Sequence, residues 1–405
     1  MSRPKLIIFS GKEKAILRRH PWVFSGAVKR IEGQPQEGDL VEVVDTSGQW
    51  LALGSYQAGE SIICKVLTFD ADEAALPIDE FLRRRIHSAV NYRVALGFFC
   101  DDMTNVFRLV HAEGDYLPGL VADWYNGVLV LQAHSVGMHR LLPVLTELFV
   151  QELKDCHCYP LKAVFDKSSA TVHGAGVQDG IVWGEKLAEQ EVLENGIRLT
   201  VNFYEGQKTG FFIDQRENRA LVQHLAMGRR ILNCFGYTGG FSLAALRGGA
   251  EYVETVDISK KAIAQCNRNV ELNFGTEASH CGVVADVLDY MNTIDKGDDA
   301  RGFDLIILDP PAFAKNHRSL QQGLKGYRSI NQRAMEKLPH GGLLMTFSCS
   351  QAVSRDDFQT MVFTAAMNAG RRVRIVRQLP HAADHPVSIH HPEGEYLKGL
   401  LLEVE

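Results

Sequence analysis

Cys349 lies between two serines in the stretch TFSCS, where an apolar run gives way to polar residues. A free cysteine is most often a small buried hydrophobe. At the end of a strand in an α/β sheet it can also be a nucleophile, because ligands of such sheets bind beyond the carboxyl ends of the strands. That use needs a nearby cation or helix N-terminus, since an ordinary thiol is only a few per cent ionised at neutral pH. Lys208, Arg216 and Lys315 are candidates for the cation.

The stretch DPPAFAK, Asp309 to Lys315, is a second group with chemical potential. Each proline removes a backbone donor and biases the preceding residue towards extended geometry, so the turn should hold Asp309 firmly. A fixed carboxylate can hydrogen-bond a planar base, and the Phe313 ring can stack on one. The alternative is a rigid strand exit with a phenylalanine in the core. If the strands before Asp309 and Cys349 are neighbours, the sulfur lies near the same base.

A glycine-rich turn, Gly236 to Gly240, follows the apolar run RRILNCF and precedes a helical segment. Its glycines permit a tight turn that a ligand can approach closely. Asp257 follows the next strand, 21 residues after Gly236, and is placed to accept hydrogen bonds from ribose hydroxyls. Asp286 ends the following strand and could reach an adenine amino group, although a carboxylate there is often only a helix cap. The turn reads G-x-x-G-G rather than G-x-G-x-x-G, which favours S-adenosylmethionine over a dinucleotide.

All these residues follow apolar segments in an alternating pattern that begins near Glu189. Strands are expected at RRILNCF, YVETVDIS, CGVVAD, FDLIILD and GGLLMTFSCS, with helical segments between them. Such alternation predicts a doubly wound, mostly parallel sheet of the Rossmann type. The last two strand-like segments, RVRIVRQ and KGLLLEV, have no clear helix between them, which predicts an antiparallel edge.

Two smaller parts precede this sheet. Residues 1–74 have short strand-like runs around turn clusters, which predicts a small β-barrel. Residues 75–188 mix helical and strand-like segments, including two runs joined at Asn126-Gly127, a strong hairpin turn. We therefore expect an α/β multidomain chain in which residues 189–405 form the third domain.

The chain is acidic, with a net charge of −6 over 405 residues, yet its first 30 residues hold eight Lys or Arg and one glutamate. This basic end includes Arg18 and Arg19 and is either a phosphate-binding face or a solvated terminus. The eight cysteines are scattered, which predicts free thiols in a reducing compartment. DCHC at residues 155–158 lacks a second ligand pair at zinc-site spacing, so no metal is expected. No apolar run has the length of a membrane helix and the N-terminus lacks a signal-peptide pattern, which predicts a cytoplasmic protein.

Taken in order, these motifs resemble those of the RlmI family, the bacterial 23S ribosomal RNA (cytosine-5)-methyltransferases. Further segments extend the resemblance over nearly the full length: LRRHPWVFSGAV, KTGFFIDQREN, LNCFGYTGGFSLAAL, NVELN, ADHPV and EGEYLKG. The resemblance implies an N-terminal PUA-like β-barrel that binds RNA, a middle α+β connecting domain and a class I methyltransferase domain with a mostly parallel seven-stranded sheet. It also implies 23S ribosomal RNA as the partner, and no membrane.

The resemblance further implies roles for individual residues. Cys349 would be the nucleophile and Asp309 would hold and polarise a cytosine, so that carbon 5 is methylated through a covalent adduct at carbon 6. S-adenosylmethionine is the implied cofactor, with contacts from Phe235, Gly236, Tyr237, Thr238, Asp257, Ile258, Asp286, Gln215 and Arg216. Substrate contacts are expected from Pro310, Phe313, Lys315, Arg18 and Arg19. Related two-cysteine enzymes carry another cysteine after the Pro-Pro motif, where this chain has Ala312 and Phe313, so the group that removes the carbon-5 proton stays open between Asp309 and a water.

Other functions remain open at this point. A methyltransferase on the same scaffold could modify a guanine or adenine nitrogen and leave Cys349 structural, because exocyclic amino groups need only positioning. A non-catalytic RNA-binding factor could keep the PUA-like domain and a degenerate sheet, although Gly236, Asp257, Asp309 and Cys349 are all present. The chain could also form a homodimer through sheet or barrel edges, which no stretch of the sequence decides.

Overall fold

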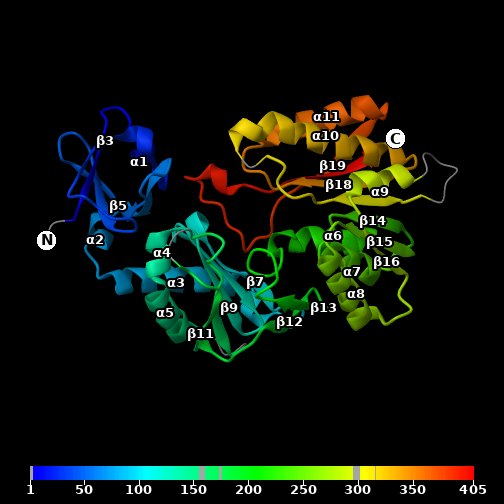
Figure 1. Ribbon diagram of the computed structural model, residues 1–405, viewed down its shortest axis with the longest axis horizontal. Coiled ribbons are helices and arrows are strands. Elements are labelled where there is room, and N and C mark those ends of the chain that lie inside the picture. Colours follow the sequence, from blue (N-terminus) through cyan, green and yellow to red (C-terminus); the bar gives the residue numbers. More distant parts are fainter. Residues whose placement is uncertain (1–2, 155–159, 173–175, 295–301, 315) are drawn as a thin grey trace. The chain divides into compact units, whose positions relative to one another are not determined.

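The computed structural model describes residues 3–154, 160–172, 176–294, 302–314 and 316–405 (Figure 1). These residues group into two compact units. The first unit comprises residues 1–196, 200–213 and 383–394, and the second comprises residues 197–199, 214–382 and 395–405. The chain thus leaves the second unit after Ala382 and re-enters it at Glu395. The domain boundaries after residues 74 and 188 stay predictions.

A six-stranded sheet begins the first unit. Its strands are β1 (Lys5–Ile8), β2 (Trp22–Phe24), β3 (Val28–Glu32), β4 (Leu40–Val44), β5 (Trp50–Tyr56) and β6 (Ile62–Thr68). Their order is β2-β6-β5-β4-β1-β3, and all neighbours are antiparallel except β1 and β4. Two short helices, α1 (Lys14–Leu17) and α2 (Ala71–Ala74), accompany the sheet. Alternate residues such as Leu6, Ile8, Val41 and Val43 form its core.

A five-stranded sheet and three helices make up the middle of the first unit. The strands are β7 (Val106–His111), β8 (Leu120–Tyr125), β9 (Val128–Ala133), β10 (Ala163–Asp166) and β11 (Gly180–Gly184), in the order β11-β10-β9-β8-β7. The helices are α3 (Ile78–Ala95), α4 (Val136–Arg140) and α5 (Leu142–Lys154). Asn126 and Gly127 have φ values of 47° and 94° between β8 and β9, which confirms the predicted hairpin turn.

A second Asn-Gly turn was not singled out in the sequence. Strands β12 (Glu189–Glu194) and β13 (Ile197–Asn202) pair as a two-stranded sheet. Asn195 and Gly196 join them with φ values of 50° and 75°, the left-handed conformation that this dipeptide favours. The start of the expected α/β alternation at Glu189 is therefore a hairpin.

A seven-stranded sheet forms the second unit. Its strands are β14 (Arg230–Cys234), β15 (Tyr252–Asp257), β16 (His280–Val284), β17 (Leu305–Leu308), β18 (Gly342–Ser348), β19 (Val373–Leu379) and β20 (Lys398–Val404). The order is β16-β15-β14-β17-β18-β20-β19. The first five strands in this order are parallel, and β20 is antiparallel to both neighbours, which confirms the mostly parallel sheet with an antiparallel edge.

Helices cover both faces of this sheet. They are α6 (Arg216–Leu225), α7 (Gly240–Arg247), α8 (Lys260–Phe274), α9 (Val287–Thr293), α10 (Leu320–Lys337) and α11 (Arg355–Ala369). Figure 1 shows α10 and α11 on one side of the strands and α6, α7 and α8 on the other. Successive strand residues such as Ile306 and Ile307 belong to the two opposite cores, which is why the strand sequences read as continuous apolar runs.

The strand order reverses at β14, whose neighbours are β15 on one side and β17 on the other. Ligands of open α/β sheets bind beyond the carboxyl ends of the strands at such a reversal. The Gly236–Gly240 turn follows β14 and Asp309 follows β17. The topology therefore brings the glycine turn and the Asp-Pro-Pro turn to the same edge of the second unit.

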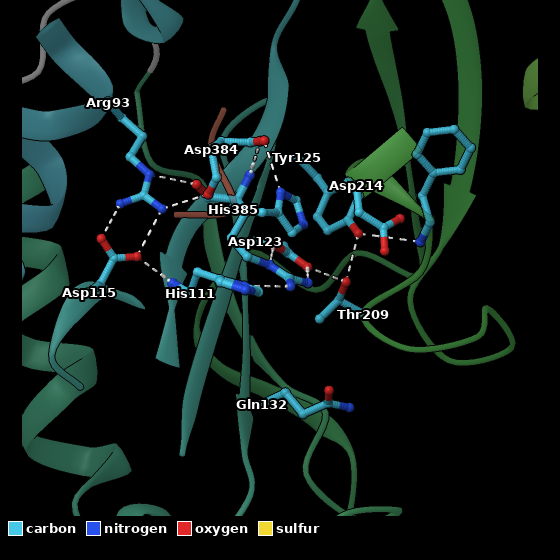
Figure 2. Close-up of polar contacts among 12 residues, drawn as sticks. Arg93, His111, Asp115, Asp123, Tyr125, Gln132, Thr209, Asp214, Asp384 and His385 are labelled. Carbon is cyan, nitrogen blue, oxygen red and sulfur yellow. Dashed lines mark hydrogen bonds and ion pairs between the residues drawn. The ribbon is translucent and has the colours of Figure 1, made fainter. Parts of the chain in front are cut away.

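The returning segment, residues 383–394, lies between β19 and β20 in the chain but packs within the first unit. Figure 2 shows the guanidinium of Arg93 directed at the carboxylate of Asp115 and at Asp384. Arg93 is fully buried, and its Nη2 donates to Asp115 Oδ2 at 2.9 Å and to the Asp384 carbonyl at 2.7 Å. The Arg108 backbone N–H donates to the Asp384 carboxylate at 2.8 Å. Buried charged groups thus fasten this segment to α3 and β7.

Candidate active site

The turn after β14 has an unusual backbone that one carboxylate holds in place. Phe235 and Tyr237 have positive φ values of 59° and 47°. Asp257, at the end of β15, accepts the Tyr237 N–H on Oδ2 at 3.0 Å and the Ser259 N–H on Oδ1 at 2.8 Å. Asn269 of α8 donates to the Thr238 carbonyl at 3.1 Å. Each carboxylate oxygen of Asp257 keeps capacity for a further donor, as ribose recognition requires.

The glycines of this turn are needed because neighbouring side chains come very close. A Cβ on Gly236 would stand 2.3 Å from Cγ2 of Thr255, and one on Gly239 would stand 2.4 Å from Sγ of Cys266. Gly239 also has a φ of 88°, which side chains of L-residues rarely adopt. The turn therefore packs its backbone directly onto β15 and α8.

Apolar residues beside Asp257 are exposed, which fits an adenosine group. Ile258 is 72% exposed and Val284 is 50% exposed. Val284 is the register partner of Asp257 on β16, so the apolar groups and the carboxylate share one edge of the sheet. An adenine ring against these side chains and a ribose at Asp257 would use both features.

Asp286 caps a helix, as one interpretation of its position predicted. Its Oδ1 accepts the N–H groups of Leu288 at 2.8 Å and Asp289 at 3.2 Å at the start of α9. The residue is exposed. Its contact with the cofactor stays a prediction.

The segment Asp214 to Asn218 is fixed to the strands around Cys349. The Tyr396 hydroxyl donates to Asp214 Oδ2 at 2.6 Å, and the Asp214 carbonyl accepts the Ala382 N–H at 3.0 Å. Gln215 is buried and its Oε1 accepts the Asn218 amide at 2.7 Å. Arg216 is 5% exposed and begins α6. The expected cofactor contacts of Gln215 and Arg216 stay predictions.

Asp309 and Cys349 follow adjacent parallel strands. Leu308 at the end of β17 is the register partner of Thr346 in β18. The Cys349 thiol lies 3.8 Å from the carbonyl oxygen of Pro310, within the range for a sulfur donor. The structure therefore brings the thiol against the turn that carries Asp309, as neighbouring strands would require.

Tyr327 of α10 contacts both the DPPAFAK turn and the TFSCS strand end. Its hydroxyl lies 2.8 Å from Ser350 Oγ and accepts the Phe313 N–H at 3.3 Å. Ser350 Oγ also accepts the Ala314 N–H at 3.2 Å. The Phe313 ring lies 4.7 Å from the Tyr327 ring, so part of it packs in the core. Tyr327 and Ser350 were not expected from the sequence, because their roles depend on which strands are neighbours.

Lys398 is a third residue that sequence reasoning missed. It starts β20 and is the register partner of Ser348, the last residue of β18. Its Nζ donates to the carbonyls of Ser350 at 2.6 Å and Tyr396 at 2.7 Å. Burial lowers the pKa of Lys398 to about 8. The motif EGEYLKG contains it, but only the antiparallel register places it beside Cys349.

Cys349 differs from the core thiols of the chain. Burial raises the pKa of Cys64, Cys234 and Cys266, and these cysteines are buried. Cys349 is only partly buried, and it stands at a strand end beside a lysine and a proline-rich turn. Its surroundings therefore fit a reactive thiol better than those of the core cysteines.

The remaining expected positions are scattered. Arg18 and Arg19 are exposed in the first unit, and Lys208, also in the first unit, places its ammonium 4.4 Å from the centre of the Phe212 ring. Lys315 and the DCHC stretch lie outside the described residues.

Within the described ranges, no group of three or more His, Cys, Asp or Glu is arranged to hold a metal ion. No helix in the same ranges is long and apolar enough to cross a bilayer.

Comparisons with known proteins identify the family of the chain. Residues 107–387 match the family described as S-adenosylmethionine-dependent methyltransferase, and residues 6–69 match a PUA-like domain. Ribosomal RNA large subunit methyltransferase I of Yersinia pestis bv. Antiqua (strain Angola) is 40% identical over 407 residues, with 99% of each chain covered. The chain belongs to the RlmI family. The protein of the same name from Yersinia pseudotuberculosis serotype O:1b (strain IP 31758) is 39% identical over the same length.

Solved structures give the RlmI-family chain the same fold. A crystal structure of a methyltransferase complexed with SAH superposes with a TM-score of 0.84 at 22% identity and covers 98% of this chain and 99% of its own. A methyltransferase from Streptococcus mutans gives a TM-score of 0.83 at 21% identity. The fold class is confirmed: a PUA-like domain is followed by a methyltransferase fold. The cofactor is S-adenosylmethionine. The turn after β14, Asp257 and Ile258 stay the residues predicted to contact it.

Proposed function

We propose that this enzyme methylates carbon 5 of a cytosine in 23S ribosomal RNA, with Cys349 as the nucleophile. The observation that carries the proposal is the position of the Cys349 thiol, 3.8 Å from the Pro310 carbonyl at the strand ends beside the cofactor edge. The curated relatives bear the name ribosomal RNA large subunit methyltransferase I, which supports the choice of RNA. Asp309 would hydrogen-bond the ring, and Pro310, Phe313 and Lys315 would contact it.

The chemistry requires a thiolate because carbon 5 of cytosine is a poor nucleophile. The Cys349 sulfur forms a bond to carbon 6, and the electron pair of the 5,6 double bond moves to carbon 5. Carbon 5 bonds to the methyl group supplied by S-adenosylmethionine, whose sulfur retains the electron pair of the broken bond. Loss of the carbon-5 proton to Asp309 or a water restores the double bond and expels the thiolate.

The nearest rival is methylation of a guanine or adenine nitrogen on the same scaffold. Nitrogen methylation requires the cofactor-binding turn after β14, Asp257 and Asp309, but no thiol. The location of Cys349 against the Asp309 turn favours carbon methylation, because nitrogen methylation gives no reason for a partly exposed thiol there.

Covalent trapping tests the proposal. The protein is incubated with S-adenosylmethionine and 23S RNA that carries 5-fluorocytidine, whose fluorine cannot leave as a proton. The wild type and a Cys281→Ala control, which lacks an exposed cysteine of β16, should form a protein–RNA adduct, and Cys349→Ala should form none. Methyl transfer to ordinary RNA without any adduct from the wild type would contradict carbon-5 chemistry and favour the nitrogen-methylating rival.

A further inference from the structure

A buried lysine lies beside the loop that carries the candidate thiol. Lys398 is 3% exposed and stands opposite Ser348 across the β18–β20 pair. Its Nζ is held by the carbonyls of Ser350 and Tyr396, at 2.6 and 2.7 Å. Ser350 directly follows Cys349, so the ammonium is fixed against the backbone of the residue next to the thiol.

The charges around Lys398 favour the ionised, negatively charged form of the Cys349 thiol. Burial lowers the pKa of Lys398 and nearby Arg355 adds to this, while the negative charges of Cys349 and Glu395 act in the opposite direction. Glu395 is ion-paired with Arg355 of α11. This pairing weakens the electrostatic attraction between Glu395 and Lys398. An ammonium that is desolvated in this way interacts strongly with any opposite charge close to it.

Four further titratable groups near this loop do not replace Lys398 as a cation. Tyr327 of α10 interacts with the charge of Cys349, Arg355 of α11 and Glu395 act on Lys398, and Asp309 precedes Pro310, whose carbonyl the thiol approaches. Burial raises the pKa of Tyr327, which keeps its phenol neutral. Arg355 is engaged by Glu395, and Asp309 carries the wrong sign to stabilise a thiolate. Among these described residues, Lys398 is thus the cation placed to stabilise a negative charge on Cys349.

We propose that Lys398 is a positioning residue that keeps Cys349 as a thiolate before RNA binds. The inference rests on the proposed function, since the thiolate matters only if Cys349 is the nucleophile. The thiol proton passes to solvent, no bond to Lys398 forms, and the ammonium stabilises the charge on sulfur. Backbone carbonyls hold the ammonium in place, so the site is charged without any contribution from the substrate.

Alkylation of the full-length protein by iodoacetamide, without RNA, reports the thiolate directly. The Cys349 peptide is quantified by mass spectrometry across pH 5–10, and the exposed Cys100 serves as an internal reference. Lys398→Met removes the charge but keeps an apolar stem, and Lys398→Arg keeps the charge. Lys337→Met is the matched control, because Lys337 is another buried lysine that donates to a backbone carbonyl, that of Ile294, at the end of α10.

We expect Lys398→Met to slow alkylation of Cys349 at pH 7 about tenfold and to shift its profile to higher pH. Cys100 should not change, Lys398→Arg should retain most of the wild-type rate, and Lys337→Met should match the wild type. Trapping on 5-fluorocytidine RNA should fall about tenfold at pH 7 in Lys398→Met and recover at pH 9, where an unassisted thiol ionises. A merely structural role gives no such recovery.

The outcomes separate the two proposals. A Lys398→Met protein that folds, as shown by a rise in Tm with S-adenosylmethionine, but keeps the wild-type alkylation profile would overturn the role of Lys398. Wild-type trapping would in that case still support Cys349 as the nucleophile. Absence of any wild-type adduct, with methyl transfer intact, would instead refute the proposed function whatever the alkylation profile.

Discussion

At the scale of single residues, Gly239 tests whether the turn after β14, which is predicted to bind the cofactor, needs its close packing. Its φ of 88° and the 2.4 Å approach of its Cβ position to Cys266 Sγ both oppose a side chain. Gly341 has a similar φ of 79° but open space around its Cβ position, so Gly341→Ala isolates the backbone strain. We expect Gly341→Ala to lower the free energy of unfolding by about 1–2 kcal/mol.

Gly239→Ala should cost at least about 1 kcal/mol more, because the turn must also move away from α8. Its affinity for S-adenosylmethionine should fall, while that of Gly341→Ala stays near the wild-type value. Urea unfolding and calorimetric titration of the cofactor measure the two effects. Equal losses in both variants would mean that the close packing on Cys266 contributes nothing.

Some members of the candidate site could be predicted from the sequence and others could not. Cys349, Asp309 and the glycine turn were found because each follows an apolar strand and has a distinctive residue type. Lys398 and Tyr327 could not be found, because their proximity to Cys349 depends on strand register and helix packing. A lysine at the start of a strand has no local signal of burial.

At the scale of elements, the buried ion pair between Arg93 and Asp115 tests how the returning segment is held. Both groups are buried, and Arg93 also binds the Asp384 carbonyl. Asp115→Asn leaves the guanidinium without its charge partner, so we expect a loss of about 3–5 kcal/mol in the free energy of unfolding. Glu80→Gln removes the exposed partner of Arg84 on the same helix and should cost no more than about 0.5 kcal/mol.

Urea unfolding of the two variants measures the difference, and limited proteolysis within residues 383–394 shows whether the segment is released. Asp115→Asn should be cleaved there faster than Glu80→Gln. A loss below 1 kcal/mol in Asp115→Asn would mean that the pair is not what fastens the segment.

The sheet of the second unit was predictable because apolar strands alternate with helical segments and both faces are covered. The β12–β13 hairpin was missed even though Asn195-Gly196 has the same turn signal as Asn126-Gly127. The attachment of the returning segment to the first unit could not be predicted, because its polar residues find partners far away in the sequence. Asp384 and Arg108, for example, are 276 residues apart.

At the scale of the whole molecule, the basic N-terminal end, residues 1–30, tests the RNA partner. Arg18 and Arg19 are exposed, whereas Arg83 and Arg84 both contact Glu80 on α3. We expect Arg18→Glu with Arg19→Glu to weaken binding of 23S RNA and to reduce the slope of log affinity against log salt by about 1–2. Affinity for S-adenosylmethionine should change less than about twofold, because the substitution changes only the charge that attracts phosphate.

Arg83→Glu with Arg84→Glu is the matched control, since it changes the net charge equally. Its effect on RNA binding should be smaller because both arginines already form ion pairs with Glu80. Salt titrations of RNA binding for both double variants decide the matter. An unchanged salt slope in the Arg18 and Arg19 variant would remove these two arginines from the RNA interface.

The returning segment also sets an order of events during synthesis. Arg93 and Arg108 emerge from the ribosome long before Asp384, their partner in the finished first unit. At about 5–20 residues per second, the 276 residues between Arg108 and Asp384 take roughly 14–55 s to translate. During that interval the guanidiniums of Arg93 and Arg108 can already pair with Asp115 and Asp123. Arg93 Nη2 and the Arg108 backbone N–H, however, must stay hydrated or use temporary acceptors until Asp384 is available. The first unit therefore cannot reach its final state until most of the second has been translated, and no single cut of the chain yields both units intact.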